Sequence, residues 1–168
     1  MKVVTKTRVY PHSIEDVWTA ITDARALAEW LMPNDFQPVL GSKFRMMVDP
    51  NPMCNSTHTE GEVVELNKPT KMVWVWRDFD RKGKVTETRV IWTLQSTPDG
   101  TLLTLRHENV QNLSFFTRLM VGMGWGMMMK NLLTKVLRNV RGGVFTPGAV
   151  PINKRYYKAK TIPADLVK

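Results

Sequence analysis

Residues 89–110 read RVIWTLQSTPDGTLLTLRHENV, and this stretch decides the fold class. Apolar side chains alternate with polar ones on both sides of a Pro98-Asp99-Gly100 sequence: Val90, Trp92 and Leu94 before it, and Leu103 and Leu105 followed by His107 after it. A period of two is typical of a strand with one buried face. An Asp-Gly turn between two such strands predicts an antiparallel hairpin, so we expect an antiparallel sheet.

The hairpin extends upstream into further strand-like segments, which are residues 36–40, 43–49, 57–67, 70–79 and 84–95. Turn residues such as Gly41-Ser42 and Arg81-Lys82-Gly83 separate them. No helical pattern lies between these segments, so sequential antiparallel pairing is the economical topology. The phase of the third segment stays open, because Glu62 alternates with Val64 and Leu66 while Val63 supports the opposite face.

The N-terminal residues predict one more strand and two short helices. Lys2 to Tyr10 has strand composition and ends at Pro11. Ser13 is a suitable cap for a helix, because apolar residues follow it at helical spacing. Thr22 or Asp23 can cap a second helix that Pro33 ends.

The C-terminal part predicts a long amphipathic helix. Its apolar positions, at the spacing of one helical stripe, are Trp125, Met129, Leu132, Leu133, Val136, Leu137 and Val140. Gly142-Gly143 ends it. The segment from Leu119 to Met129 is rich in methionine and glycine, so we expect an irregular start or a bend near Gly122 to Gly126. This segment and the loop from Asp49 to Thr57 would then form walls of a cavity entrance.

The charge of the chain is unevenly distributed. Its 168 residues have a formal net charge of +9, and all of the excess lies in residues 118–168, which hold 10 Lys/Arg and one acid, Asp165. The chain lacks the common nucleic-acid-binding motifs, which argues against nucleic acid as a partner. The cations on the helix fit an ordinary solvated face.

Other features exclude several classes of site and location. The longest apolar-plus-glycine run has eleven residues, too few to span a bilayer, and the N-terminus has no secretion signal. One cysteine, Cys54, rules out an internal disulfide framework and points to a reducing, cytoplasmic location. His58 and Glu60 lack a third ligand at metal spacing, so we expect no metal site. Nucleotide-binding and nucleophile-elbow motifs are also missing, so we expect no cofactor.

The sequence divides into residues 1–143, which form the main domain, and a basic extension, residues 144–168, with three prolines. We expect this extension to dock through Phe145, Ile152, Tyr156, Tyr157 and Ile162. It would lie either across its own sheet or on a neighbouring subunit, where it would support a homodimer.

Tryptophan and methionine converge between the sheet and the C-terminal helix, and two interpretations stay open. One is a plain core of Trp and Met; the other is an apolar cavity for a small molecule. The expected lining of such a cavity is Trp30, Phe44, Met46, Trp74, Trp76, Trp92, Leu105, His107, Met123 and Met127. His107 would supply one orienting hydrogen bond. Next to a carboxylate it could instead act as a general acid or base.

Five stretches carry a family resemblance: residues 8–33, 39–46, 60–77, 89–110 and 124–137. In this order they resemble the START-like, birch-pollen-allergen-like helix-grip superfamily (SRPBCC). Within it the chain is similar to the branch named for the activator of heat-shock protein 90 ATPase. It departs from that branch in having Gly41-Ser42 where paired glycines are common, a longer loop at 49–57, and the extension after Gly143.

The resemblance implies an α+β helix-grip fold, in which a curved antiparallel sheet wraps around a long C-terminal helix, with two short helices after the first strand. It also implies an apolar cavity. Relatives include lipid or hormone carriers, polyketide cyclases and chaperone activators, so the fold leaves the activity open. We expect binding of a small, largely apolar molecule. The alternatives are a cyclase, dehydratase or hydrolase-like enzyme using His107, and a protein-interaction or chaperone-activator-like module using the basic C-terminal face.

Overall fold

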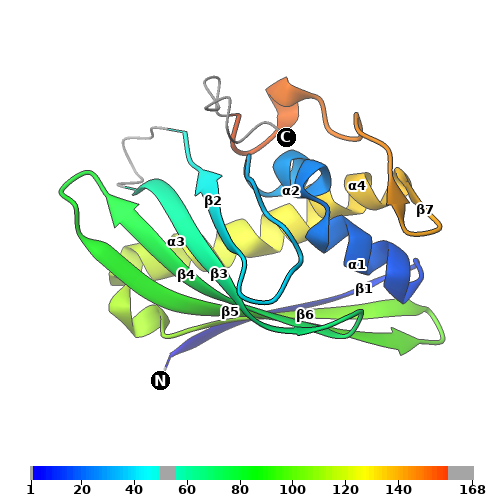
Figure 1. The fold of residues 1–168 in the computed structure, drawn as a ribbon, viewed down its shortest axis with the longest axis horizontal. Coiled ribbons are helices and arrows are strands. Elements are labelled where there is room, and N and C mark those ends of the chain that lie inside the picture. The colour runs from blue at the N-terminus through cyan, green and yellow to red at the C-terminus, as the bar shows by residue number, and fades with distance from the viewer. Residues whose placement is uncertain (1, 50–55, 159–168) are drawn as a thin grey trace.

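Six strands form one antiparallel sheet in the computed structural model, which describes residues 2–49 and 56–158. The order across the sheet is β1-β6-β5-β4-β3-β2, so neighbours in sequence pair from β2 to β6 and the first strand closes beside the last (Figure 1). The strands are β1 (Val3–Tyr10), β2 (Lys43–Met47), β3 (Ser56–Asn67), β4 (Lys71–Asp80), β5 (Val85–Thr97) and β6 (Gly100–Glu108). The expected antiparallel sheet is confirmed.

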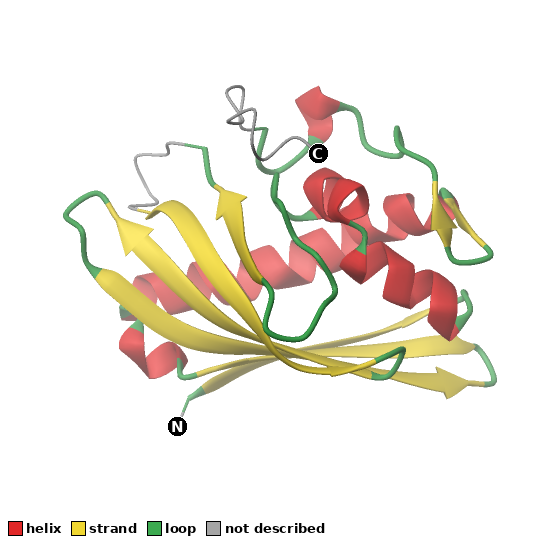
Figure 2. Ribbon diagram, in the orientation of Figure 1, coloured by secondary structure: helices red, strands yellow, loops and turns green. Residues whose placement is uncertain are grey.

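The helices all lie on one side of this curved sheet (Figure 2). Two short ones, α1 (Ile14–Thr22) and α2 (Ala24–Trp30), follow β1 as expected, with Ser13 and Asp23 as their N-caps. The long C-terminal helix has three parts: α3 (Phe115–Met127), a π-helix (Met128–Leu133) and α4 (Thr134–Arg138). This is the α+β helix-grip arrangement. The remaining elements are the short strands β7 (Val140–Arg141) and β8 (Val144–Phe145) and two 3-10 turns, Val110–Asn112 and Ile152–Lys154.

Two details of the sheet differ from the sequence expectation. Residues 36–40 form a loop instead of a strand, in keeping with the missing backbone donor of Pro38. In β3 the register shifts between Val63 and Glu65, so that Val63 is buried while Val64 points outward. This β-bulge changes the alternation within the strand, which is why the sequence supported both phases.

The C-terminal helix starts earlier than expected. Its irregular part also lies further along the chain than expected. The N-cap Ser114, whose side chain accepts from the amide of Thr117, lies eleven residues before Trp125, the first residue of the expected stripe. The glycine-rich segment is regular α-helix, and the irregularity is the π-helix after it. The expectation of an irregular start or a bend at Gly122 to Gly126 is therefore wrong. Tertiary packing compensates for the low helix propensity, because Gly122 and Gly126 face Val4 and Lys6 of β1.

Edge-to-face aromatic rings fill the core between sheet and helices. Trp74 packs against Phe44 and Trp92 with ring centroids 5.3 and 5.4 Å apart, and Trp92 contacts Trp30 at 6.0 Å. Phe44 covers Gly61 on the paired strand so closely that a Cβ there would lie 2.1 Å from the ring. The glycine is therefore a packing requirement of this core.

Residues 144–157 dock on the domain's own helices. The Phe145 and Val150 side chains are fully buried in the main core. The carboxylate of Glu29 in α2 accepts from the amides of Gly148 and Val150, both at 2.7 Å, and Arg155 lies 3.4 Å from it. Because Glu29 is almost completely buried, these partners satisfy a charge that water cannot reach.

The expected anchors of the extension have different outcomes. Phe145 is buried and Tyr157 packs against the core, so the segment docks on its own chain, but on α1 and α2 instead of across the expected sheet. Ile152 and Tyr156 are exposed, which corrects their expected burial, because Val150 occupies the core position in this segment. Ile162 lies outside the described residues, as do residues 50–55 of the expected entrance loop.

We predict that Glu29→Ala releases this segment. Two charge-assisted hydrogen bonds and an ion pair are lost, so the free energy of unfolding should fall by about 2–4 kcal/mol. Trypsin should cut faster after Lys154 and Arg155. Denaturant titration and limited proteolysis measure the two effects, with exposed Glu15→Ala as the control. Unchanged stability and cleavage would show that Glu29 does not hold the segment.

Candidate functional site

A cavity of about 600 Å³ lies at the end of the sheet where α3 begins. It is bounded by the start of β3 and β5, the end of β4 and β6, and the inner side of α3. Its apolar lining comes from Leu31, Met32, Val48, Trp76, Leu113, Phe116, Met120, Val121, Trp125 and Met128. Tyr156 and Tyr157 of the docked C-terminal segment also line it. The volume suits a small organic molecule.

A buried hydrogen-bond chain joins α3 to the sheet at this cavity. The indole Nε1–H of Trp125 donates to Nδ1 of His107 at 3.1 Å. An indole nitrogen is a donor only, so Nδ1 carries no proton and the proton sits on Nε2. Nε2 then donates to the Thr88 hydroxyl at 2.8 Å, and this hydroxyl donates to the carbonyl of Trp76 at 3.3 Å. Every member of the chain has its partner.

This arrangement keeps His107 neutral. Burial lowers the pKa of His107 to about 4, because the imidazolium form would lose its hydration without gaining a counterion. Both ring nitrogens are already engaged by Trp125 and Thr88. A general base needs a free lone pair and a general acid needs a proton near neutral pH, so the geometry favours an orienting, structural role.

Asp78 is the carboxylate most deeply set in the cavity wall. Its Oδ1 accepts from the Thr59 hydroxyl at 2.7 Å and from the Trp76 indole N–H at 3.1 Å. Burial raises the pKa of Asp78 above its usual range, against the opposing effect of these two hydrogen bonds. The sequence contained a signal for it, since Asp78 continues the alternation of Met72, Trp74 and Trp76 along β4.

The ten expected lining residues separate into three groups. Trp76 and His107 line the cavity. Six others are buried in the aromatic core beside it and do not line it: Trp30, Phe44, Met46, Trp74, Trp92 and Leu105. Both interpretations of the Trp and Met convergence thus describe part of the molecule, a packed core that continues into a cavity.

Met123 and Met127 form the third group, and their expected place in the cavity lining is wrong. They lie on the outer side of α3, 60% and 42% exposed. Successive residues turn by about 100° around a helix, so positions two away from inward-facing Trp125 point outward. The inner side instead presents Met120, Gly124 and Met128.

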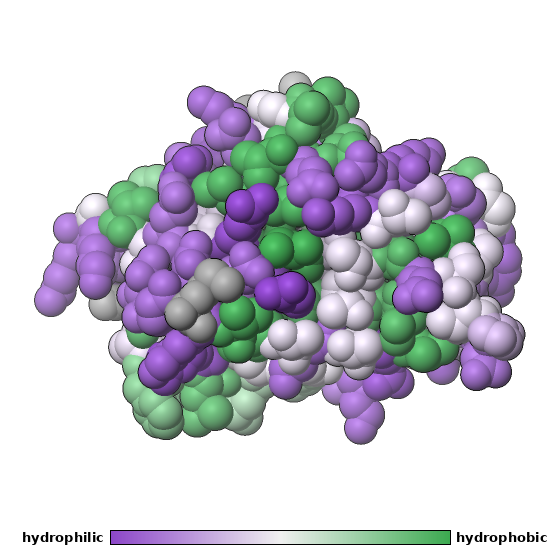
Figure 3. Space-filling view, turned by 90° about the horizontal axis from the view of Figure 1, so that it is seen from below, coloured by the Kyte–Doolittle hydropathy of each residue, from purple (hydrophilic) through white to green (hydrophobic). Residues whose placement is uncertain are grey.

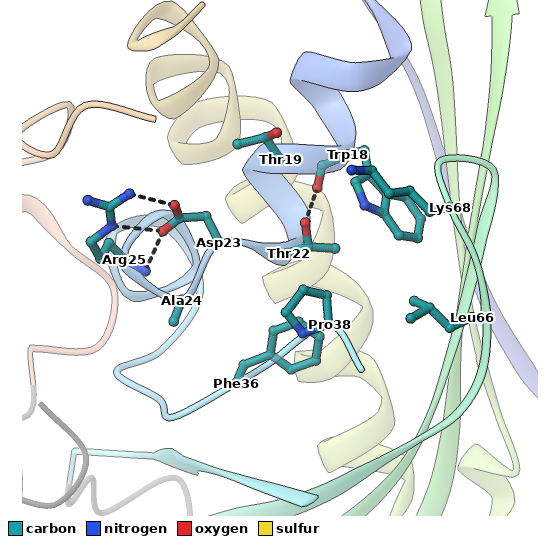
Figure 4. A pocket seen from close by; sticks show the side chains of 10 residues that line it. All are labelled: Trp18, Thr19, Thr22, Asp23, Ala24, Arg25, Phe36, Pro38, Leu66 and Lys68. Carbon is teal, nitrogen blue, oxygen red and sulfur yellow. Dashed lines mark hydrogen bonds and ion pairs between the residues drawn. The ribbon is translucent and has the colours of Figure 1, made fainter. Parts of the chain in front are cut away.

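A second hollow of about 530 Å³ lies between α1, α2 and the end of β3 (Figure 4). Its main charged group is already paired: Asp23 caps α2 through the amides of Arg25 and Ala26 and accepts from the Arg25 guanidinium. Thr22 likewise donates to the carbonyl of Trp18. We therefore place the candidate site in the cavity under α3.

The described ranges, 2–49 and 56–158, show two further negative findings. No helix there is long and apolar enough to cross a membrane. These same ranges bring together no group of three His, Cys, Asp or Glu side chains that could hold a metal ion.

We predict that His107 makes stability depend on pH. The folded pKa lies near 4 and the unfolded one near 6.5, so the unfolded state binds the additional proton between these values. The contribution of neutral His107 to the free energy of unfolding is complete above pH 6.5. It decreases as the pH falls, and about 3 kcal/mol has been lost at pH 4. His107→Gln keeps a donor and an acceptor but cannot titrate, so its stability difference from wild type should shrink on acidification. Denaturant titrations from pH 7 to pH 4.5 measure it; a constant difference would contradict the burial of a neutral imidazole.

Comparison with known proteins places this chain in a family. The model of the family described as Activator of Hsp90 ATPase homolog 1-like protein matches residues 11–138. No curated protein sequence matches the chain. Among solved structures, protein MLL2253 from Mesorhizobium loti is 25% identical with a TM-score of 0.67, and the match covers 79% of this chain and 94% of that one.

Two further structures share the fold at lower identity. The Aha1 protein from Colwellia psychrerythraea, solved as a dimer, is 16% identical with a TM-score of 0.65, over 85% of this chain and 98% of that one. DynU16, from the dynemicin biosynthetic locus, is 19% identical with a TM-score of 0.67, over 90% of this chain and 51% of DynU16. Since the family model covers most of its length, the chain belongs to the Activator of Hsp90 ATPase homolog 1-like family.

Proposed function

We propose that the chain binds a small, largely apolar molecule in the cavity under α3. The observation that carries this proposal is the cavity itself, about 600 Å³ lined mainly by aromatic and aliphatic side chains with a few polar groups. Such a combination is the usual composition of small-molecule sites. The assignment of DynU16 to a biosynthetic locus supports it, since proteins of such a locus handle small organic compounds.

The contacts of His107 favour binding over catalysis through this residue. A reaction at His107 would first have to break its bond to Trp125 or to Thr88. Either break would leave a buried polar group unpaired, at a cost of about 1–3 kcal/mol. We therefore rank the cyclase-, dehydratase- or hydrolase-like alternative below ligand binding.

One specific observation favours a second candidate, a protein-interaction module. The outer side of α3 exposes a row of apolar side chains: Phe115, Leu119, Met123 and Met127. Figure 3 shows hydrophobic surface gathered at the lower left, at the end of the molecule where α3 begins. Contiguous exposed apolar side chains often mark contact surfaces. The dimeric state of the Colwellia psychrerythraea Aha1 protein supports self-association as the simplest form of this candidate.

We predict that filling the cavity from α3 weakens binding without destabilising the fold. A Cβ added at Gly124 meets only the Met128 Cε, at 3.9 Å, so Gly124→Leu extends into the cavity and also improves helix propensity by up to about 1 kcal/mol. Affinity for the neutral probe Nile red, titrated by fluorescence, should fall at least about tenfold, while the melting temperature does not decrease.

The matched control for this variant is Gly126→Leu, two residues along the same helix. Its side chain would grow toward the flexible end of Lys6 and away from the cavity. It should gain the same helix propensity and keep probe binding. Equal loss in both variants, or probe binding that survives Gly124→Leu, would overturn the proposed site.

For the second candidate we predict a particle of twice the 19.3 kDa chain mass in light scattering. Leu119→Glu places a charge in the exposed apolar row of α3 and should return the mass to that of one chain. Glu29→Ala loosens only the C-terminal segment. A dimer made by the α3 face should therefore persist in this variant, whereas a dimer made by the extension should be lost. A wild-type particle of one chain's mass would remove self-association as a function of this face.

A further inference from the structure

The charge of the cavity is opposite to that of the chain. The charged side chains among its described lining residues are Asp49, Asp78, Asp80 and Lys84. The whole chain has a formal net charge of +9. Salt screens exposed charges beyond about 8 Å at physiological ionic strength, so a ligand inside the cavity responds mainly to these local groups. Its immediate surroundings are therefore acidic.

Within this group, Asp78 has an oxygen available to a ligand. Its two hydrogen bonds, from Thr59 and Trp76, both end on Oδ1. Oδ2 has no hydrogen-bond partner among residues 2–49 and 56–158. No cation in those ranges contributes to the pKa of Asp78, which burial raises. The carboxylate is held in position by its neighbours and has no counterion within the described part of the chain.

Asp80 provides the second carboxylate, which is held in place at the tip of the β4–β5 hairpin. Its Oδ1 accepts from the amides of Lys82 and Lys84, both at 2.8 Å, so the side chain cannot swing away from the turn. Asp80 follows Asp78 by two residues on β4, so both side chains lie on the cavity side of the sheet. The pair forms an acidic wall opposite α3.

Aromatic rings complete the lining beside this acidic wall. Trp76 and Trp125 are packed 6.0 Å apart at the inner end of the cavity, and Phe116, Tyr156 and Tyr157 line it further out. Aromatic faces attract cations and also provide apolar contact area. A carboxylate set among aromatic rings is the combination that recognises organic ammonium groups.

We propose that the cavity selects molecules with a cationic amine on an apolar body, the ammonium contacting Oδ2 of Asp78 and the body contacting Trp76 and Trp125. This inference rests on the proposed function, because it specifies which small apolar molecules enter the same cavity. It excludes fatty acids and other apolar carboxylates as preferred ligands, because they would place a second negative charge beside Asp78 and Asp80.

Three probes of one shape test the charge preference: phenylbutylamine, phenylbutanol and phenylbutanoate, titrated by calorimetry at pH 7.5. The amine should bind at least about tenfold more tightly than the carboxylate, with the alcohol between them, and high salt should narrow the difference. Equal affinities, or a preference for the carboxylate, would overturn the inference.

Asp78→Asn assigns the preference to one residue. The amide oxygen can still accept from Thr59 and Trp76, so the variant should fold and bind the alcohol within about twofold of wild type, while amine affinity falls about five- to tenfold. Asp99→Asn removes the same charge at the opposite end of β5 and should change nothing. If Asp78→Asn leaves the amine affinity unaltered, Asp78 is not the anchor and the inference fails.

The alcohol separates this inference from the proposed function. If the alcohol binds and Gly124→Leu blocks it, the cavity is a binding site whatever its charge preference. If none of the three probes binds, both the proposed function and the amine preference fail.

Discussion

The hydrogen bond from the Trp125 indole to His107 fixes where the C-terminal helix touches the sheet, and the rest of the structure depends on that point. On its C-terminal side, Leu133, Val136 and Leu137 are fully buried against sheet and short helices. On its N-terminal side the helix covers a cavity instead. The contact is strong because the hydrogen bonds continue from His107 through Thr88 to the Trp76 carbonyl. Each donor in this series therefore has an acceptor. This series of hydrogen bonds thus lies at the boundary between the packed core and the cavity.

Sequence alone predicts the parts of this fold that rest on local periodicity. The alternation around Pro98-Asp99-Gly100 identifies the hairpin, and the helical stripe from Trp125 identifies the inner face of the last helix. The β3 bulge and the π-helix are different, because each changes the local period along the chain. In β3 the count of periods along the sequence leaves two phases open, and in the C-terminal helix it gives no sign of the change.

The candidate site was predicted less completely, for two physical reasons. The alternation along the strands places Trp74 and Trp92 on the face toward the helix and so predicts them in the cavity, yet large rings that pack edge to face fill the space there. The tyrosines at 156 and 157 reach the cavity because the segment before them docks on the helices, where Glu29 of α2 binds the amides of Gly148 and Val150. A buried glutamate in a short helix gives no sequence signal for such a partner.

The same reasoning explains how a basic protein comes to have an acidic cavity. Strand geometry decides which charges face inward: on β4, Asp78 and Asp80 share the phase of Trp74 and Trp76, whereas Arg77 lies on the other face and pairs with Glu87 of β5. Lys135 and Arg138 of α4 point to solvent, on the side opposite its buried stripe. Net charge therefore describes the surface of this chain, while the chemistry available to a bound molecule is set mainly by the phase of β4.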